Sequence, residues 1–161
     1  MKQINDHINW EDCIIVGIPL VDKQHHNLLR MTKKLYIACN DEDETSNIFP
    51  YDTIHEIMDN MATHFQTEEK LMVLLQYKGL INHKQIHEDI FRKITVETSL
   101  FSMGKIYIPK LFINSLKELF LSHIAIHDLK IAEQIRNMKD FGKFEMLLAK
   151  KQEEIKIGVK P

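Results

Sequence analysis

Apolar residues recur at intervals of three and four along four long stretches of the chain. This is the period of an amphipathic α-helix with one buried face. Asp22 is placed as an N-cap for the first stretch, Pro50 suits the first turn of the second, and Pro109 lies near the start of the fourth. The predicted helices cover residues 22–40, 50–77, 81–102 and 109–139.

Short connections between the four helices favour an all-α, antiparallel up-down-up-down four-helix bundle. An N-terminal arm over residues 1–20 is expected to be irregular, because Gly17 and Pro19 interrupt it. The polar stretch from Asn40 to Asn47 reads as a loop. We assign residues 1–140 to the bundle domain and residues 141–161 to a C-terminal tail, either a short extra helix or a frayed end.

Composition excludes several classes of protein. The 161 residues suit one domain, and a formal net charge of −2 gives no electrostatic reason to expect nucleic acid or an anionic membrane as partner. The only cysteines, Cys13 and Cys39, form no CxxC pair and suit a reducing compartment. The longest apolar run, residues 13–21, is too short to span a bilayer, and the N-terminus lacks a signal core. We therefore expect a cytoplasmic protein without a membrane partner.

Histidine is the unusual feature, with 9 in the chain, most of them inside the predicted helices. Side chains four residues apart on a helix project from one face, so such a pair can reach one metal ion or two adjacent ions. Each predicted helix carries ligand types near its apolar stripe. These are His25 in the first helix, His64 and Glu68 in the second, His83 and His87 in the third, and His123, His127 and Asp128 in the fourth.

A single inward histidine is more often a hydrogen-bonded core residue than a ligand. The inward Glu68 is harder to explain in this way, because a buried carboxylate without a cation is costly. Taken together, imidazoles and carboxylates from four helices predict a shared metal site. His26, adjacent to His25, points about 100° away from it. We assign no site to His7, His26 or His55.

The absence of thiolates from the set argues against structural zinc and iron–sulfur clusters. Mixed imidazole and carboxylate ligands suit iron, with manganese or zinc as alternatives. Five histidines and two carboxylates, with His127 left aside, are more ligands than one ion needs, so the sequence predicts two iron ions. If both carboxylates bridge and an oxo or hydroxo group does too, about one coordination position stays open, where dioxygen would bind.

These residues resemble the hemerythrin family, and bacteriohemerythrins in particular, over about residues 10–135. The segment from Trp10 through Val-Gly-Ile to Asp-Lys-Gln-His25 is similar to that family's N-terminal signature. The later motifs match as well. They are His64-Phe-Gln-Thr-Glu68-Glu-Lys-Leu-Met72, His83-x-x-x-His87 and His123-x-x-x-x-Asp128.

The resemblance implies a ligand set for each iron. One iron is held by His83, His87 and His123, and the other by His25 and His64, with Glu68 and Asp128 bridging. The iron with two imidazoles would be the one that takes oxygen. Leu119 departs from the family, which often has tryptophan at this position in the oxygen pocket.

His127 competes with Asp128. On an ideal helix Asp128 lies about 140° from His123, whereas His127 lies on the same face. One hypothesis is a π-type bulge that widens the last helix and brings both His123 and Asp128 to the metals. The alternative makes His127 the ligand and leaves Asp128 exposed. The resemblance favours Asp128.

The resemblance implies a non-enzymatic protein that binds dioxygen reversibly for storage, delivery or sensing. Sensing would require a separate protein partner. The alternatives are a di-iron oxidase or peroxidase, and a protein of nitric-oxide handling or iron repair. Ferritin-like di-iron enzymes use more carboxylates, with Glu-x-x-His pairs three apart, whereas the pairs here are four apart and rich in imidazole.

Overall fold

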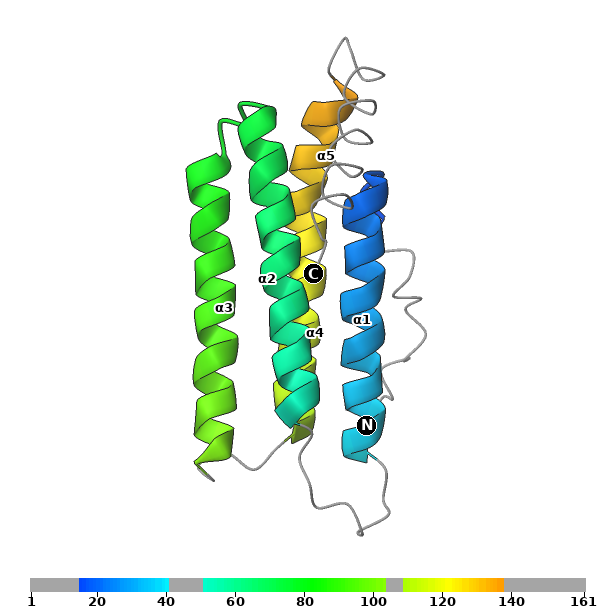
Figure 1. Cartoon of the computed structure of the whole chain (residues 1–161), viewed down its shortest axis with the longest axis vertical. Helices are drawn as coiled ribbons and strands as arrows, with labels where there is room; N and C mark the ends of the chain where they lie inside the picture. Colours follow the sequence, from blue (N-terminus) through cyan, green and yellow to red (C-terminus); the bar gives the residue numbers. More distant parts are fainter. Residues whose placement is uncertain (1–14, 41–50, 104–108, 138–161) are drawn as a thin grey trace, which may run out of the picture.

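The chain forms a bundle of long helices in a computed structural model that describes residues 15–40, 51–103 and 109–137 (Figure 1). These described residues contain no strand. The predicted all-α four-helix bundle is confirmed. The helices are α1 (Pro19–Asn40), α2 (Tyr51–Leu74), α3 (Leu80–Ser102) and a last helix made of α4 (Pro109–His123), η2 (Ile124–Asp128) and α5 (Leu129–Arg136).

Each helix packs against two neighbours. α1 contacts α2 and α4, and α3 contacts the same two helices from the other side of the bundle. Consecutive helices run in opposite directions, and Figure 1 shows α2 and α3 joined by a tight connection at one end. This arrangement gives all four helices an inward face on one common core.

α1 begins at Pro19, three residues earlier than predicted. Proline has its φ angle fixed near the helical value and needs no N–H partner in the first turn, so it starts the helix well. Asp22 consequently lies inside the helix and is not its N-cap. Its carboxylate instead accepts hydrogen bonds from the backbone N–H groups of Val16 (2.7 Å) and Gly17 (3.1 Å), which holds the chain ahead of α1.

α2 ends at Leu74, three residues before the predicted end. Gln76 takes a left-handed conformation with φ of 50°. The N–H of Tyr77 donates to the carbonyl of Met72 (2.9 Å), and the N–H of Gln76 donates to that of Val73 (3.1 Å). This is the Schellman pattern that closes a helix C-terminus, here with a glutamine in the place usually taken by glycine.

Two apolar clusters fill the bundle, one above the other along its length. One contains Val21, Leu71 and Ile131 among others, and the second contains Leu35, Met61 and Leu116. Buried polar side chains from all four helices form the layer between the two clusters. Ile37 belongs to neither cluster and is 57% exposed, because it lies about 180° around α1 from the buried Leu28.

Several predictions fall outside the described residues. These are most of the N-terminal arm, the loop after Asn40, and the boundary between the 1–140 domain and the 141–161 tail. None of the helices in the described segments has the length and apolar character needed to cross a membrane.

Candidate metal centre

All seven predicted ligand side chains meet in the layer between the two apolar clusters. Each is at most 3% exposed, although all are polar. Every helix of the bundle contributes at least one of them. They are His25 from α1, His64 and Glu68 from α2, His83 and His87 from α3, His123 from the end of α4 and Asp128 from η2.

The seven side chains form two overlapping groups. Within each group, one ligand atom from every residue lies within 4.8 Å of the others, close enough to share one ion. Glu68 belongs to both groups. The groups are Glu68, His83, His87 and His123, and His25, His64, Glu68 and Asp128.

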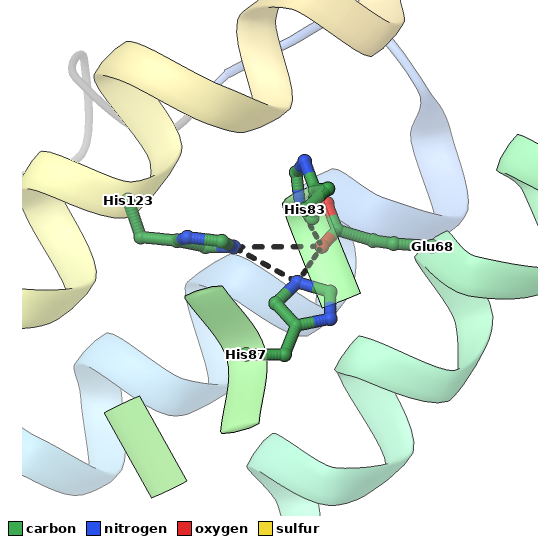
Figure 2. Close-up of side chains that lie close together, drawn as sticks. All are labelled: Glu68, His83, His87 and His123. Atoms are coloured by element: carbon green, nitrogen blue, oxygen red, sulfur yellow. Dashed lines mark hydrogen bonds and ion pairs between the residues drawn. The ribbon is translucent and has the colours of Figure 1, made fainter. Parts of the chain in front are cut away.

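Glu68 is the centre of the first group. Figure 2 shows the imidazoles of His83, His87 and His123 pointing toward its carboxylate from α3 and α4. Its Oε2 lies 3.6 Å, 3.2 Å and 3.7 Å from their Nε2 atoms, respectively. The Nε2 of His64 approaches the same oxygen at 3.6 Å from the other group.

Asp128 links the two groups as well. Its Oδ2 lies 3.3 Å from Nε2 of His25, while its Oδ1 lies 3.0 Å from Nε2 of His123 and 3.5 Å from Nε2 of His83. Both carboxylates therefore face imidazoles of both groups, which is the placement required of bridging ligands.

The local helix geometry determines which side chain, that of His127 or that of Asp128, points into the buried layer. Ile124–Asp128 is a π-helix, in which the N–H of Leu129 donates to the carbonyl of Ile124 five residues back. The extra residue in the turn brings Asp128 to 1% exposure, while His127 is only half-buried and belongs to neither group. The π-type bulge predicted from the spacing is therefore present.

Two histidines of the centre, His123 and His64, have pKa values shifted in opposite directions. Burial by itself lowers the pKa of His123, but the carboxylates of Asp128 and Glu68, 3.0 Å and 3.7 Å from its Nε2, raise it to about 9. Burial lowers the pKa of His64 to about 4, more than the nearby Glu68 can offset. Without a metal, one proton is therefore held on His123 between the two acids, and His64 stays neutral.

The two carboxylates stay ionised in spite of their burial. Burial raises the pKa of each, and the neighbouring Glu68 raises that of Asp128 further. Contacts with the imidazoles more than offset this, led by His64 for Glu68 and by His123 for Asp128, so that the pKa of each acid lies below its ordinary value. Two ionised acids at 3.0–3.7 Å from the nitrogens of five imidazoles are the donor set of a cation site.

The hydrogen-bond geometry also fits a metal. Four imidazole nitrogens surround one oxygen of Glu68 at 3.2–3.7 Å, longer than the roughly 2.9 Å of an ordinary N–H···O bond. Nε2 of His83 and both oxygens of Asp128 are buried and make no well-shaped hydrogen bond among the described residues. Such atoms are costly in a core unless they share a partner, and a cation is the partner that accepts lone pairs from all of them.

Two histidines to which no site was assigned, His26 and His55, are exposed on the surface of the helices. His7 lies outside the described residues. Two outer residues were missed at the sequence level, Glu69 and Gln24, whose side chains reach the far nitrogens of His87 and His64. The second glutamate of the Glu68-Glu69 pair was a visible signal for one of them.

The comparison with protein families decides the classification. The model of the family described as "Hemerythrin HHE cation binding domain" matches residues 16–135. The chain belongs to the hemerythrin family. The matched segment begins just before α1 and ends within α5, so it covers all seven ligand-type residues of the centre.

Individual hemerythrins are similar over much of their length. A bacteriohemerythrin of Stenotrophomonas maltophilia is 27% identical over 127 residues, which are 79% of this chain and 80% of that protein. A bacteriohemerythrin of Pseudomonas aeruginosa is 29% identical over 99 residues, 62% of this chain and 63% of that protein. Myohemerythrin-1 of Phascolopsis gouldii is 24% identical over 121 residues, 75% and 88% of the two chains. No solved structure matches the chain.

Proposed function

We propose that the chain binds dioxygen reversibly at a pair of iron ions held in the layer between the two apolar clusters. His83, His87 and His123 would hold one ion and His25 and His64 the other, with Glu68 and Asp128 shared. The observation that carries the proposal is the presence of two buried ligand groups with Glu68 in common. When bound, a ferrous pair supplies two electrons and an open coordination position for dioxygen.

The residues make the two positions unequal. Three imidazoles serve one position and two serve the other, so the position at His25 and His64 has the smaller protein ligand set. Imidazole and carboxylate donors without thiolate suit iron. The same set agrees with the description of the family as a cation-binding domain.

The chain contributes the surroundings as well as the ligands. Apolar side chains close the layer on both sides, with Leu29, Met72 and Ile124 from one cluster and Leu28, Phe65 and Phe120 from the other, all at most 6% exposed. This lining keeps bulk water from the ligands and disfavours the escape of charged species. Leu119 packs half-buried against the second cluster.

Anaerobic loading with ferrous iron followed by exposure to air tests the proposal. We expect two irons per chain and a charge-transfer absorption that appears in air and disappears when oxygen is removed, over several cycles. Glu68→Ala should abolish both the metal binding and the absorption, because it removes the ligand common to both groups. Glu88→Ala, a change at an exposed acid of α3, should leave both intact.

Two results would contradict reversible binding. Iron content below two per chain in the parent protein would reject the paired site. Oxidation that is complete after one exposure and is not reversed by removing oxygen would favour the oxidase or peroxidase alternative.

A further inference from the structure

The outward nitrogens of two inner histidines meet acceptors of different charge. Nδ1 of His87 lies 3.3 Å from Oε1 of Glu69, a carboxylate. Nδ1 of His64 lies 3.4 Å from Oε1 of Gln24, a neutral amide. The two histidines belong to different ligand groups, so the difference falls between the two metal positions of the proposed function.

Glu69 is held in place from the far side. Its other oxygen, Oε2, accepts from Nζ of Lys84 at 3.0 Å. Burial raises the pKa of Glu69, but the contacts with Lys84 and His87 more than offset this and lower it below its ordinary value. Lys84 and Glu69 are 47% and 26% exposed, so this pair connects the solvent-facing side of α2 and α3 to a ring that is only 3% exposed.

The ring of His87 has little freedom left. Phe65 stacks on it with ring centres 3.8 Å apart and planes 7° apart. The stacking sets the plane of the imidazole, and once a metal takes the lone pair of Nε2 the ring proton lies on Nδ1, where the carboxylate of Glu69 accepts it. With the proton on Nδ1, the lone pair of Nε2 points at Glu68 and His123, where the metal belongs.

The side-chain amide of Gln24, which faces His64, is oriented by a separate chain of hydrogen bonds. The hydroxyl of Thr67 donates to the carbonyl of Thr63 (2.9 Å), so its oxygen can only accept from the NH₂ group of Gln24 (3.0 Å). The carbonyl oxygen of Gln24 is thereby turned toward His64. This acceptor carries no net charge.

We propose that Glu69 is a positioning residue for His87 and that the Glu69/Gln24 difference makes the His83–His87–His123 position the tighter metal site. A carboxylate makes a hydrogen bond to Nδ1–H that is roughly twice as strong as one to a neutral acceptor, and this hydrogen bond increases the donor strength of Nε2. The inference rests on the proposed pair of metal positions. It adds a residue that touches neither metal nor dioxygen.

Stepwise titration of the metal-free protein with Co²⁺, in competition with a chromophoric chelator, tests this inference without using oxygen. In the parent chain we expect two Co²⁺ ions with different dissociation constants. Glu69→Ala should weaken the tighter site by about 10–100-fold, the usual cost of losing an outer partner of a metal-bound histidine, and leave the weaker site within about threefold. Glu69→Gln should fall between the two, because an amide oxygen can still accept.

Glu88→Gln is the matched control. It removes the same charge from an exposed position next to His87 in sequence and should leave both constants unchanged. The Nδ1–H proton of His87 gives a second readout, measured by ¹H NMR of the Zn²⁺-loaded chain. We expect a downfield Nδ1–H resonance in the parent and in Glu88→Gln, and an upfield shift of this resonance in Glu69→Ala, because the carboxylate acceptor is lost.

The outcomes separate this inference from the proposed function. Two Co²⁺ sites with unchanged constants and an unchanged Nδ1–H resonance in Glu69→Ala would overturn the role of Glu69 and leave the paired site standing. An equal loss at both sites would mean that Glu69 only supports the fold, which also overturns it. A parent chain that binds fewer than two ions would overturn both.

Discussion

Adjacent residues of the last helix have very different surroundings. Asp128 is 1% exposed and faces His25, His83 and His123, whereas His127 is half-buried beside the same layer. Helical spacing alone favours His127 as the inward residue, because it stands four residues after His123 and so lies on the same face of an α-helix. The structure places the acid inside because the local backbone, and not the side-chain chemistry, selects which residue points inward.

The two residues can be tested with a matched pair of substitutions. Asp128→Asn should reduce metal content below two per chain, because it removes an anionic ligand shared by both groups, at a cost larger than the 10–100-fold typical of an outer partner. His127→Asn should retain full metal content. Metal analysis after desalting gives the answer. Full iron in Asp128→Asn would reject Asp128 as a ligand.

The proton on His123 predicts what happens when a metal enters. The pKa of about 9 means that the metal-free chain carries this proton at pH 8, while a metal ligand must be unprotonated. Zn²⁺ binding at pH 8 should therefore release about one proton from His123, and this release should vanish above about pH 10. Calorimetry in two buffers of different ionisation enthalpy measures it. No release at pH 8 would show that the proton is absent.

The same proton links folding to pH. The pKa of His123 is raised from its unfolded value near 6.5 to about 9, so its contribution to stability is complete below pH 6.5 and is lost as the pH rises through 9. The shift corresponds to about 3 kcal/mol at most. Unfolding by denaturant at pH 6.5 and pH 9.5 should show the metal-free protein less stable at the higher pH. His123→Gln should lose most of this dependence.

At the scale of the helix, the π-turn of η2 joins two segments of the last helix whose buried faces point in different directions. Before it, Leu116 and Phe120 point inward, and after it Ile131 and Ile135 do. At about 100° per residue, the centres of these two pairs differ by about 60°, and the difference grows to about 90° when the other buried apolar residues, Phe112, Ile113 and Ala132, are included. This is close to the angle of one inserted residue. η2 absorbs that residue, so both halves of the helix keep their apolar side chains in the core.

This predicts that deleting one residue from the middle of the helix will be tolerated. Deletion of His127 converts the π-turn to α-helix, leaves both buried faces in place and keeps Asp128 on the face of His123. We expect a melting temperature within a few degrees of the parent and retained metal binding. Circular dichroism and metal analysis measure both.

Deletion of Lys130 is the control, since it is exposed but lies after Asp128. The helix can then keep Ile131 and Ile135 buried only by losing the π-turn, which rotates Asp128 about 100° away from the site. In the Lys130 deletion, either the metal content or the melting temperature should therefore fall. If the His127 deletion behaved in the same way, the account of η2 would be wrong.

At the scale of the whole molecule, the centre joins helices that differ in how much apolar surface they bury. Eight side chains of α2 are buried, and six of them are apolar or aromatic. α3 has four buried side chains among those described, and two of these are the imidazoles His83 and His87. The docking of α3 therefore depends more on the metal centre than the docking of α2 does.

Removal of the metal with a chelator should destabilise the bundle unevenly. An ion at 1,000 times its dissociation constant adds about 4 kcal/mol, which corresponds to about 10 °C in melting temperature for a chain of this size. Amide hydrogen exchange should increase more in α3 than in α2 when the metal is removed. Equal increases in both helices would contradict the dependence of α3 on the centre.

The sequence by itself determined the helices, their inward faces and the seven polar residues on them. Spacing of three and four is a local property, and residues such as His64 and Glu68 share a face whatever the rest of the chain does. The offset between His123 and Asp128 was also local, which is why a π-turn could be predicted there.

Only the tertiary structure decided which atoms meet. The helix ends at Pro19 and Leu74 depended on specific backbone conformations, and the partners Glu69 and Gln24 became visible only when helices far apart in sequence were packed together. Hydrogen bonds between helices depend on rotation and register, which periodicity does not specify. The unequal surroundings of His87 and His64 are therefore a property of the packed bundle.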